Sequence, residues 1–208
     1  MDQTQPRTLS EFMRARFRGV VDGIGMVLKE LGVTPISLSL VGLAGHLVAA
    51  VLVARGEFLI GGLFLLFLAP VDAFDGTLAR LRGETSNFGG FFDSVIDRYS
   101  EMLVFGGLLI YFQNRFDKGM VTLVFIAAAG SVLVSYTRAR GEALGYVVRG
   151  GMLTRFERYL ILIPSLLFGL PKWGVGIVAV LANVTAVQRF LDVRKQAWDK
   201  KEKAFRER

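Results

Sequence analysis

Residues 72–97 read DAFDGTLARLRGETSNFGGFFDSVID and place four aspartates between apolar stretches long enough to cross a bilayer. A charged side chain in or near a bilayer is costly, so such residues usually face a watery cavity, a partner or an ion. Four carboxylates close together require a counter-charge. We therefore expect the rest of the chain to be arranged around these aspartates.

Helical spacing gathers the aspartates on two faces. One face of a first helix carries, at positions i, i+3, i+4 and i+7, Asp72, Asp75, Gly76 and Ala79. One face of a second helix carries, at i, i+4 and i+8, Gly89, Asp93 and Asp97. The small residues leave both faces nearly bare. If the helices pack antiparallel across the 81–87 connection, the two pairs of carboxylates face each other and hold either protons or metal.

The ligand chemistry favours a hard divalent cation. Carboxylate oxygens without a neighbouring His or Cys suit Mg²⁺ or Mn²⁺, and two such ions can bridge a phosphate and lower the pKa of an attacking oxygen. We predict a site for two Mg²⁺ or Mn²⁺ ions, formed by Asp72, Asp75, Asp93 and Asp97. Two other interpretations stay open: a helix interface ion-paired by Arg80, Arg82 and Arg98, and a carboxylate-lined ion transporter.

Composition places the chain among polytopic membrane proteins. Hydrophobic residues make up 52% of the 208 residues, and the absence of cysteine excludes disulfides and thiolate sites. The net charge of +7 comes from basic residues that flank apolar runs, which favours membrane lipids rather than nucleic acid as partners. The first 19 residues lack the apolar core of a signal peptide.

Apolar runs and turn signals predict an all-α fold with six transmembrane helices and an N-terminal amphipathic surface helix at residues 8–31. The expected spans are 35–54, a second from Phe58 into the aspartate stretch with a kink at Pro70, a third from 85–87 to about Phe112, and then 119–137, 159–170 and 173–191. We expect one domain over residues 1–208, with the bundle at 35–194 and a basic cytoplasmic tail at 195–208.

Lys and Arg are distributed unequally between the two ends of these spans. One side holds only Arg55, Arg115, Lys118 and Lys172. By the positive-inside rule the other, basic side is cytoplasmic, which puts both termini and the aspartates there, in the plasma membrane. The single histidine, His46, lies mid-span in an apolar helix and reads as a hydrogen-bonded packing residue, and the glycines at 42, 45, 106 and 107 read as helix contacts.

The aspartate stretch, written Asp72-x2-Asp75-Gly76-x2-Ala79-Arg80-x8-Gly89-x3-Asp93-x3-Asp97, resembles the signature of the CDP-alcohol phosphotransferase family. The resemblance implies transfer of a phosphatidyl-type group from a CDP-linked lipid to an alcohol, with release of CMP. It also implies that the four aspartates bind metal and that Asp97 is the general base toward the acceptor hydroxyl.

The resemblance further implies a set of contacts to the nucleotide and CDP-lipid. These are Pro35, Ser37, Asp72, Gly76, Ala79, Arg80, Ser86 and Gly89. The bare positions would let the nucleotide lie against the helix, Arg80 would pair with its phosphates, and Ser86 would add a hydroxyl at a helix N-terminus. Family members often begin the first span with Thr-Pro-Asn, whereas this chain reads TPIS at 34–37.

Basic residues on separate helices of the cytoplasmic side predict a pocket for an acceptor phosphate or carboxylate. The candidate residues are Ser135, Arg138, Arg155, Arg158 and Arg189. The stretches SYTRARGEALG, RFERYLIL and VQRF resemble the phosphatidylinositol phosphate synthase branch of the family, although that branch often carries a proline where this chain has Phe156. The resemblance implies inositol 1-phosphate as the acceptor and a homodimer; glycerol 3-phosphate and serine remain alternative acceptors.

Overall fold

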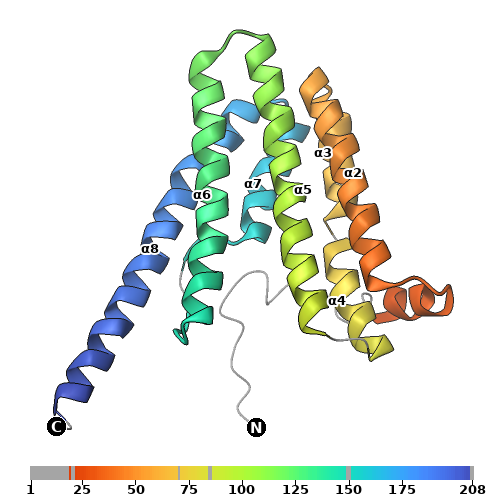
Figure 1. Cartoon of the computed structure of the whole chain (residues 1–208). Helices are drawn as coiled ribbons and strands as arrows, with labels where there is room; N and C mark the ends of the chain where they lie inside the picture. The colour runs from red at the N-terminus through yellow and green to blue at the C-terminus, as the bar shows by residue number, and fades with distance from the viewer. Residues whose placement is uncertain (1–18, 20–21, 70, 84–85, 149–150, 207–208) are drawn as a thin grey trace. The chain divides into compact units, whose positions relative to one another are not determined.

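Figure 1 shows the chain as a computed structural model that describes residues 19, 22–69, 71–83, 86–148 and 151–206. Within these ranges the regular structure is helical and includes no strand, which confirms the all-α prediction for them. The helices are α2 (Pro35–Arg55), α3 (Phe58–Leu68), α4 (Val71–Arg82), α5 (Asn87–Asn114), α6 (Lys118–Ala143), α7 (Arg155–Leu167) and α8 (Pro171–Arg206).

Three helices of the described chain are long and apolar enough to cross a membrane: α2, α6 and residues 171–202 of α8. An α-helix rises about 1.5 Å per residue, so the 21 residues of α2 match a hydrocarbon core of about 30 Å. The protein is therefore a helical membrane protein. The count of six spans stays a prediction.

The expected second span is divided into two helices. α3 ends at Leu68 and α4 begins at Val71. The kink predicted at Pro70 lies outside the described residues.

The other helix ends differ from the prediction mainly in length. α6 extends beyond the expected 119–137, α7 begins before 159, and α8 continues through most of the expected tail. Of the predicted surface helix, residues 22–30 are helical, whereas most of 8–21 lies outside the described residues. The extra residues are the polar ends of these helices. A prediction from runs of apolar residues does not include them.

The chain forms two compact units, of which unit 1 comprises residues 1–111 and 166–169. In it α2 packs against α3 and α4, and α5 approaches α2 so closely that a Cβ on Gly107 would lie 2.4 Å from the Ala50 carbonyl oxygen. Arg82 Nη1 donates to the Val33 carbonyl at 3.1 Å. The C-terminal end of α4 is thereby held beside the start of α2.

Two sequence predictions about α2 are confirmed in unit 1. His46 is 1% exposed and its Nδ1 lies 2.8 Å from the Gly42 carbonyl oxygen, so this buried histidine is hydrogen-bonded within its own helix. Gly45 makes a helix contact, because a Cβ there would lie 2.6 Å from a methyl of Leu68.

Unit 2 comprises residues 112–165 and 170–208, and its main feature is the packing of α6 along α8. A Cβ on Gly130 would lie 3.1 Å from the Asn183 backbone nitrogen, and Asn183 Nδ2 donates to the Ile126 carbonyl at 3.2 Å. At the start of both helices Lys172 Nζ donates to Asp117 Oδ2 at 2.6 Å. α6 and α8 therefore run side by side in the same direction (Figure 1).

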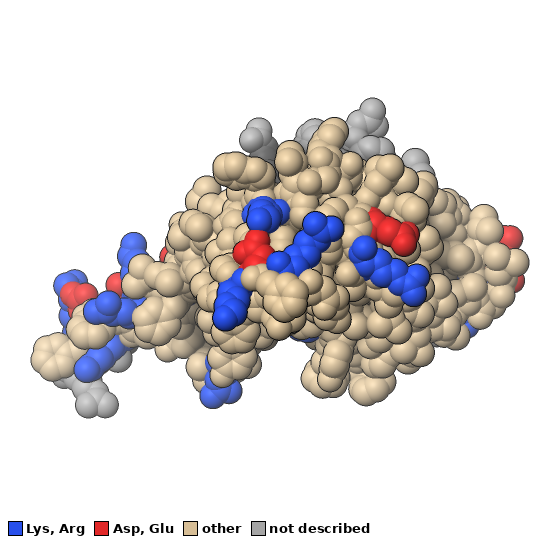
Figure 2. Space-filling model, turned by 90° about the horizontal axis from the view of Figure 1, so that it is seen from above, with Lys and Arg blue, Asp and Glu red and all other residues tan. Residues whose placement is uncertain are grey.

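The face seen from above carries few charged side chains. Figure 2 shows Lys, Arg, Asp and Glu side chains near the middle of the view and toward its left and right edges, among mostly uncharged residues.

Candidate active site

The backbone of α4 places Asp72 and Asp75 in its first turns, but the side chains of both lie outside the described residues. The structure therefore describes the side chains of only two of the four predicted ligands, Asp93 and Asp97. Among the described side chains no three carboxylates or histidines gather into a metal-binding group. The four-aspartate site consequently stays a prediction.

The α5 side of the site begins with a helix cap. Ser86 Oγ accepts a hydrogen bond from the Gly89 amide at 2.9 Å, which confirms the predicted N-terminal cap. A Cβ on Gly89 would lie 3.2 Å from that oxygen, so the glycine gives the cap room as well as leaving the helix face bare.

Asp93 and Asp97 follow on the same face of α5, and both are half-buried. Asp97 Oδ2 lies 3.5 Å from Arg98 Nη2, a contact that leaves 19% of the Asp97 side chain exposed. The two half-buried carboxylates are one helical turn apart, and their oxygens are the type of ligand that a hard divalent cation prefers. The contact with Arg98 is one that the ion-paired alternative predicts.

The α4 side carries an open position where the sequence predicts one. Gly76 is exposed. Apart from the neighbouring backbone of α4, no described atom lies within 4 Å of the position that a Cβ would occupy. Ala79 is half-buried beside it. Arg80 is exposed, with its Nη2 donating to Thr77 Oγ1 at 2.8 Å. The exposed guanidinium is accessible to an anionic ligand.

The predicted nucleotide contacts on α2 lie in its N-terminal cap. Pro35 is the first helical residue, and the Ser37 amide donates to Thr34 Oγ1 at 3.2 Å while the Thr34 amide donates to Ser37 Oγ at 3.1 Å. This reciprocal capping box engages the Ser37 hydroxyl locally. The Arg82 bond to Val33 brings the end of α4 to the same cap.

Within unit 2 the predicted acceptor residues differ in burial. Arg158 is fully buried and its Nη1 donates to the Leu153 carbonyl at 3.3 Å, whereas Arg189 is 4% exposed and its Nη1 donates to the Val134 carbonyl at 2.6 Å. Arg189 lies within electrostatic range of Arg158 and Arg138. Guanidinium groups from α6 and α7 thus lie within electrostatic range of Arg189 on α8, and the acceptor pocket itself stays a prediction.

The remaining predicted acceptor residues are less buried. Arg155 lies over the ring of Tyr159, 5.3 Å from its centroid, and Arg138 is exposed with its Nε donating to Glu142 Oε1 at 2.9 Å. Ser135 Oγ donates to the Ser131 carbonyl at 3.4 Å on its own helix. The cluster therefore has a buried part and an exposed rim.

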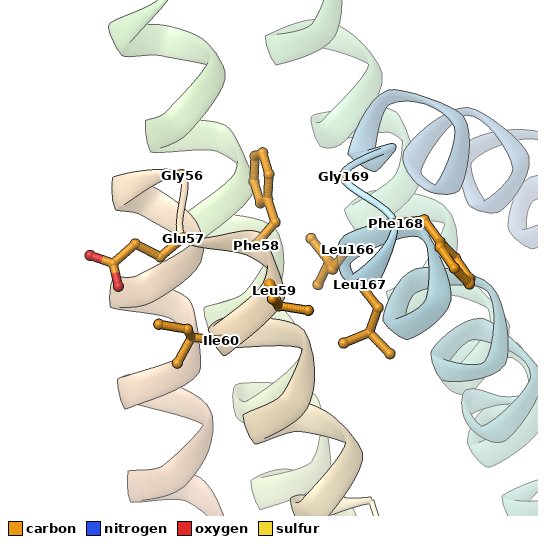
Figure 3. Close-up of a pocket in the computed structure, with 9 residues that line it drawn as sticks. All are labelled: Gly56, Glu57, Phe58, Leu59, Ile60, Leu166, Leu167, Phe168 and Gly169. Atoms are coloured by element: carbon orange, nitrogen blue, oxygen red, sulfur yellow. The ribbon is translucent and has the colours of Figure 1, made fainter.

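A groove of about 540 Å³ in unit 1 lies between the start of α3 and the end of α7 (Figure 3). Its walls are apolar, and the carboxylate of Glu57 points away from it. Because it borders Gly56, the C-cap of α2, it lies at the opposite end of that helix from Thr34. A groove without an inward-facing charged group cannot supply phosphoryl-transfer chemistry, so we exclude it as the active site.

Sequence reasoning missed one buried acid and two buried hydroxyls. Glu101 is 1% exposed and lies one turn beyond Asp97. It continues the four-residue spacing that begins at Gly89, so the sequence could have indicated it. Ser131 and Thr185 are fully buried one turn before Ser135 and Arg189. They carry no charge, and no motif of the sequence selects them.

These features define the class first: a helical membrane protein with carboxylates on one helix pair and arginines gathered from three other helices. The chain belongs to the CDP-alcohol phosphatidyltransferase family, whose sequence profile matches residues 32–188. The matched range includes every predicted metal ligand and all but one of the predicted acceptor residues, Arg189 lying one position beyond it. The chain is therefore an enzyme of this family's type.

Named relatives extend the match to almost the whole chain. A phosphatidylinositol phosphate synthase of Streptomyces avermitilis is 36% identical over 91% of this chain and 84% of its own length. An archaetidylinositol phosphate synthase of Pyrococcus horikoshii is 35% identical over 88% of this chain and 96% of its own length.

The fold is similar to that of a solved relative. The crystal structure of Mycobacterium tuberculosis phosphatidylinositol phosphate synthase with CDP-DAG bound has a TM-score of 0.78 at 29% identity, over 84% of this chain and 93% of that one. The same enzyme in complex with manganese and citrate has a TM-score of 0.74 at 30% identity, over 83% and 88%.

Proposed function

We propose that this protein transfers a phosphatidyl-type group from CDP-diacylglycerol, or an archaeal CDP-lipid, to inositol 1-phosphate and releases CMP. The observation that carries the proposal is the buried pair Arg158 and Arg189 beside a half-exposed arginine rim. Buried guanidinium groups favour a phosphate-bearing acceptor through charge-assisted, bidentate hydrogen bonds. The names of the relatives from Streptomyces avermitilis and Pyrococcus horikoshii support the inositol phosphate.

The donor side of the reaction is assigned to unit 1. Asp72, Asp75, Asp93 and Asp97 would hold two Mg²⁺ or Mn²⁺ ions, which would neutralise the diphosphate and the charge on the departing CMP. The manganese complex of the Mycobacterium tuberculosis relative supports a divalent cation. The CDP-lipid would lie against a set of residues around the bare helix faces: Pro35, Ser37, Asp72, Gly76, Ala79, Arg80, Ser86 and Gly89.

Asp97 is proposed as the general base. A carboxylate can accept the proton of an acceptor hydroxyl that comes within hydrogen-bond reach. The acceptor oxygen then bonds to the phosphorus that carries the diacylglycerol, the bond from that phosphorus to the bridging oxygen breaks, and CMP leaves.

The acceptor side is assigned to Ser135, Arg138, Arg155, Arg158 and Arg189. Their positive charge would repel a cationic acceptor such as choline and attract an alcohol phosphate. Glycerol 3-phosphate also carries a phosphate, whereas serine carries only a carboxylate. The number of basic groups therefore favours either alcohol phosphate over serine.

The proposed enzyme is a homodimer in the plasma membrane, with six spans and with both termini and the active site in the cytoplasm. Basic flanks on one side of the spans support this orientation. Cysteine labelling in intact cells tests it, since the chain has no cysteine of its own. A cysteine introduced at Lys118 should react with an impermeant reagent and one introduced at Lys201 should not; the reverse pattern would invert the topology.

One assay tests the proposed reaction. The purified protein in detergent is given CDP-diacylglycerol and Mg²⁺ with inositol 1-phosphate, glycerol 3-phosphate or serine in parallel, and CMP release is measured. We expect turnover with inositol 1-phosphate to exceed the other two, and EDTA to abolish it. Selective turnover of glycerol 3-phosphate would refute the inositol assignment, and no CMP release with any acceptor would refute the proposed reaction.

A further inference from the structure

Unit 2 contains three buried side-chain oxygens that have no hydrogen-bond partner within the described part of the chain: Ser131 Oγ, Thr185 Oγ1 and Gln188 Oε1. Ser131 and Thr185 are 0% exposed. Buried polar atoms are nearly always hydrogen-bonded, because leaving one unsatisfied destabilises the folded state. Three such atoms in one unit therefore indicate a ligand or another function.

Neighbouring hydroxyls of the same unit behave differently. Thr122 Oγ1 donates to the Lys118 carbonyl at 3.1 Å, and Thr137 Oγ1 donates to the Leu133 carbonyl at 2.7 Å. This bond to the carbonyl four residues earlier is the usual way to satisfy a hydroxyl on a helix. Ser131 and Thr185 do not use it, so their hydroxyls are available to another group.

Ser131 and Thr185 lie at the same level of the paired helices. The Asn183 bond to the Ile126 carbonyl and the Arg189 bond to the Val134 carbonyl link α8 to α6 on either side of them. Thr185 and Gln188 share a face of α8 with Arg189, at i, i+3 and i+4. Along their helices, Ser131 and Thr185 thus lie about one turn from Ser135 and Arg189, and Gln188 is next to Arg189.

The chain before α7 packs against this face of α8. A Cβ on Gly151, whose φ is +111°, would lie 2.5 Å from Thr185 Cγ2 and 3.0 Å from Arg189 Nε. Thr185 and Arg189 therefore face the same segment, and a side chain at position 151 would collide with both. The glycine lets the backbone before α7 pass close to the Thr185 methyl group and the Arg189 guanidinium.

We propose that Ser131, Thr185 and Gln188 bind the hydroxyl groups of a phosphorylated polyol, one turn from the arginines that bind its phosphate. The inference rests on the proposed function and names the part of the acceptor site that distinguishes a polyol from a smaller alcohol phosphate. A site built to hydrogen-bond a substrate hydroxyl discriminates strongly against an analogue that lacks it, because its own polar groups are then left unpaired.

The test is Thr185→Val, which keeps the shape of the side chain and removes the hydroxyl. We expect the KM for inositol 1-phosphate to rise about fivefold to tenfold, as for the loss of one hydrogen bond. The KM for CDP-diacylglycerol should not change. Tm should stay equal or rise, because a buried unsatisfied hydroxyl is removed. Ser131→Ala should act in the same direction, and Thr137→Val, whose hydroxyl is bonded within its helix, is the matched control.

A binding measurement separates this inference from the proposed reaction. The rise in Tm on adding inositol 1-phosphate to the intact protein requires no turnover, and we expect it to be smaller in Thr185→Val than in the wild type. Equal rises in both would overturn the inference while leaving the reaction standing. The absence of a rise in the wild type would also overturn it, and CMP release measured on the same sample decides separately whether the proposed function fails.

Discussion

The two units hold their polar side chains in different ways. In unit 1 two polar groups of the candidate site bond within three residues along the chain, Ser86 to Gly89 and Arg80 to Thr77. In unit 2 the buried Arg189 donates to Val134, which is 55 positions earlier in the sequence. Unit 1 therefore presents ligands from locally determined helix faces, whereas unit 2 builds its cluster by packing separate helices.

This difference has a functional consequence. Half-buried carboxylates on a helix face stay accessible to solvent cations and to a nucleotide diphosphate. Buried arginines are less hydrated, so each hydrogen bond they give to an anion contributes more to binding than one from the surface. Four predictions test whether the division is real.

The largest effect is expected in unit 1, from Asp97→Asn. Removing a general base should lower CMP release by about 10²–10⁴-fold. Tm should change little, because the contact with Arg98 at 3.5 Å is partly exposed. Glu57→Gln, an exposed acid in the same unit, is the control and should retain activity. Turnover of Asp97→Asn within a few-fold of the wild type would remove the residue's role as base.

The next effect separates the buried and exposed parts of unit 2. Arg189→Gln should raise the KM for the acceptor about 10–100-fold, since a hydrogen bond to a charged group contributes about 1.5–3 kcal/mol. Arg138→Gln should have a smaller effect, because its side chain is 56% exposed and pairs with Glu142. Steady-state kinetics with varied acceptor measures both, and equal effects would contradict a role for burial.

A third prediction concerns the packing that presents the carboxylates. Gly107→Ala should lower the free energy of unfolding by about 1–3 kcal/mol, because its Cβ would meet the Ala50 backbone at 2.4 Å. Gly106→Ala, one residue away, meets no described atom within 4 Å and should be neutral or stabilising. Thermal unfolding in detergent compares them; a similar loss in both variants would mean that the α2–α5 contact is not tight.

The smallest effect concerns the surface of unit 2. The hydrogen bond from Lys172, followed by that from the Met120 amide, lowers the pKa of Asp117. A lowered pKa stabilises the fold above the ordinary aspartate range, and this contribution is lost as the pH falls through the folded-state pKa. The Tm difference between wild type and Lys172→Met should thus shrink on acidification below about pH 4. A difference that grows on acidification would contradict the assignment.

The spacing of the aspartates and their neighbours predicted much of unit 1. Ser86 as a cap, the open position at Gly76 and the hydrogen-bonded His46 all follow from residues within four positions of one another. The kink predicted at Pro70 lies outside the described residues, with α3 ending before it and α4 beginning after it.

The acceptor cluster was less predictable. The sequence predicted which arginines share one side of the membrane, but their burial depends on how α6, α7 and α8 pack. Ser131 and Thr185 carry no charge and match no family motif, so neither positive-inside reasoning nor the resemblance selects them. Only the absence of a bonding partner within the described chain distinguishes them from other hydroxyls of a helix.

The sequence by itself determined the class of protein, the helical spacing of the predicted metal ligands and the chemistry they suit, because helix periodicity, apolar run length and ligand type are properties of neighbouring residues. The tertiary structure decided which guanidinium groups are buried and which buried hydroxyls lack a partner within the described chain. Burial and hydrogen-bond satisfaction depend on side chains that are far apart in the chain, and the packing of separate helices brings those side chains together.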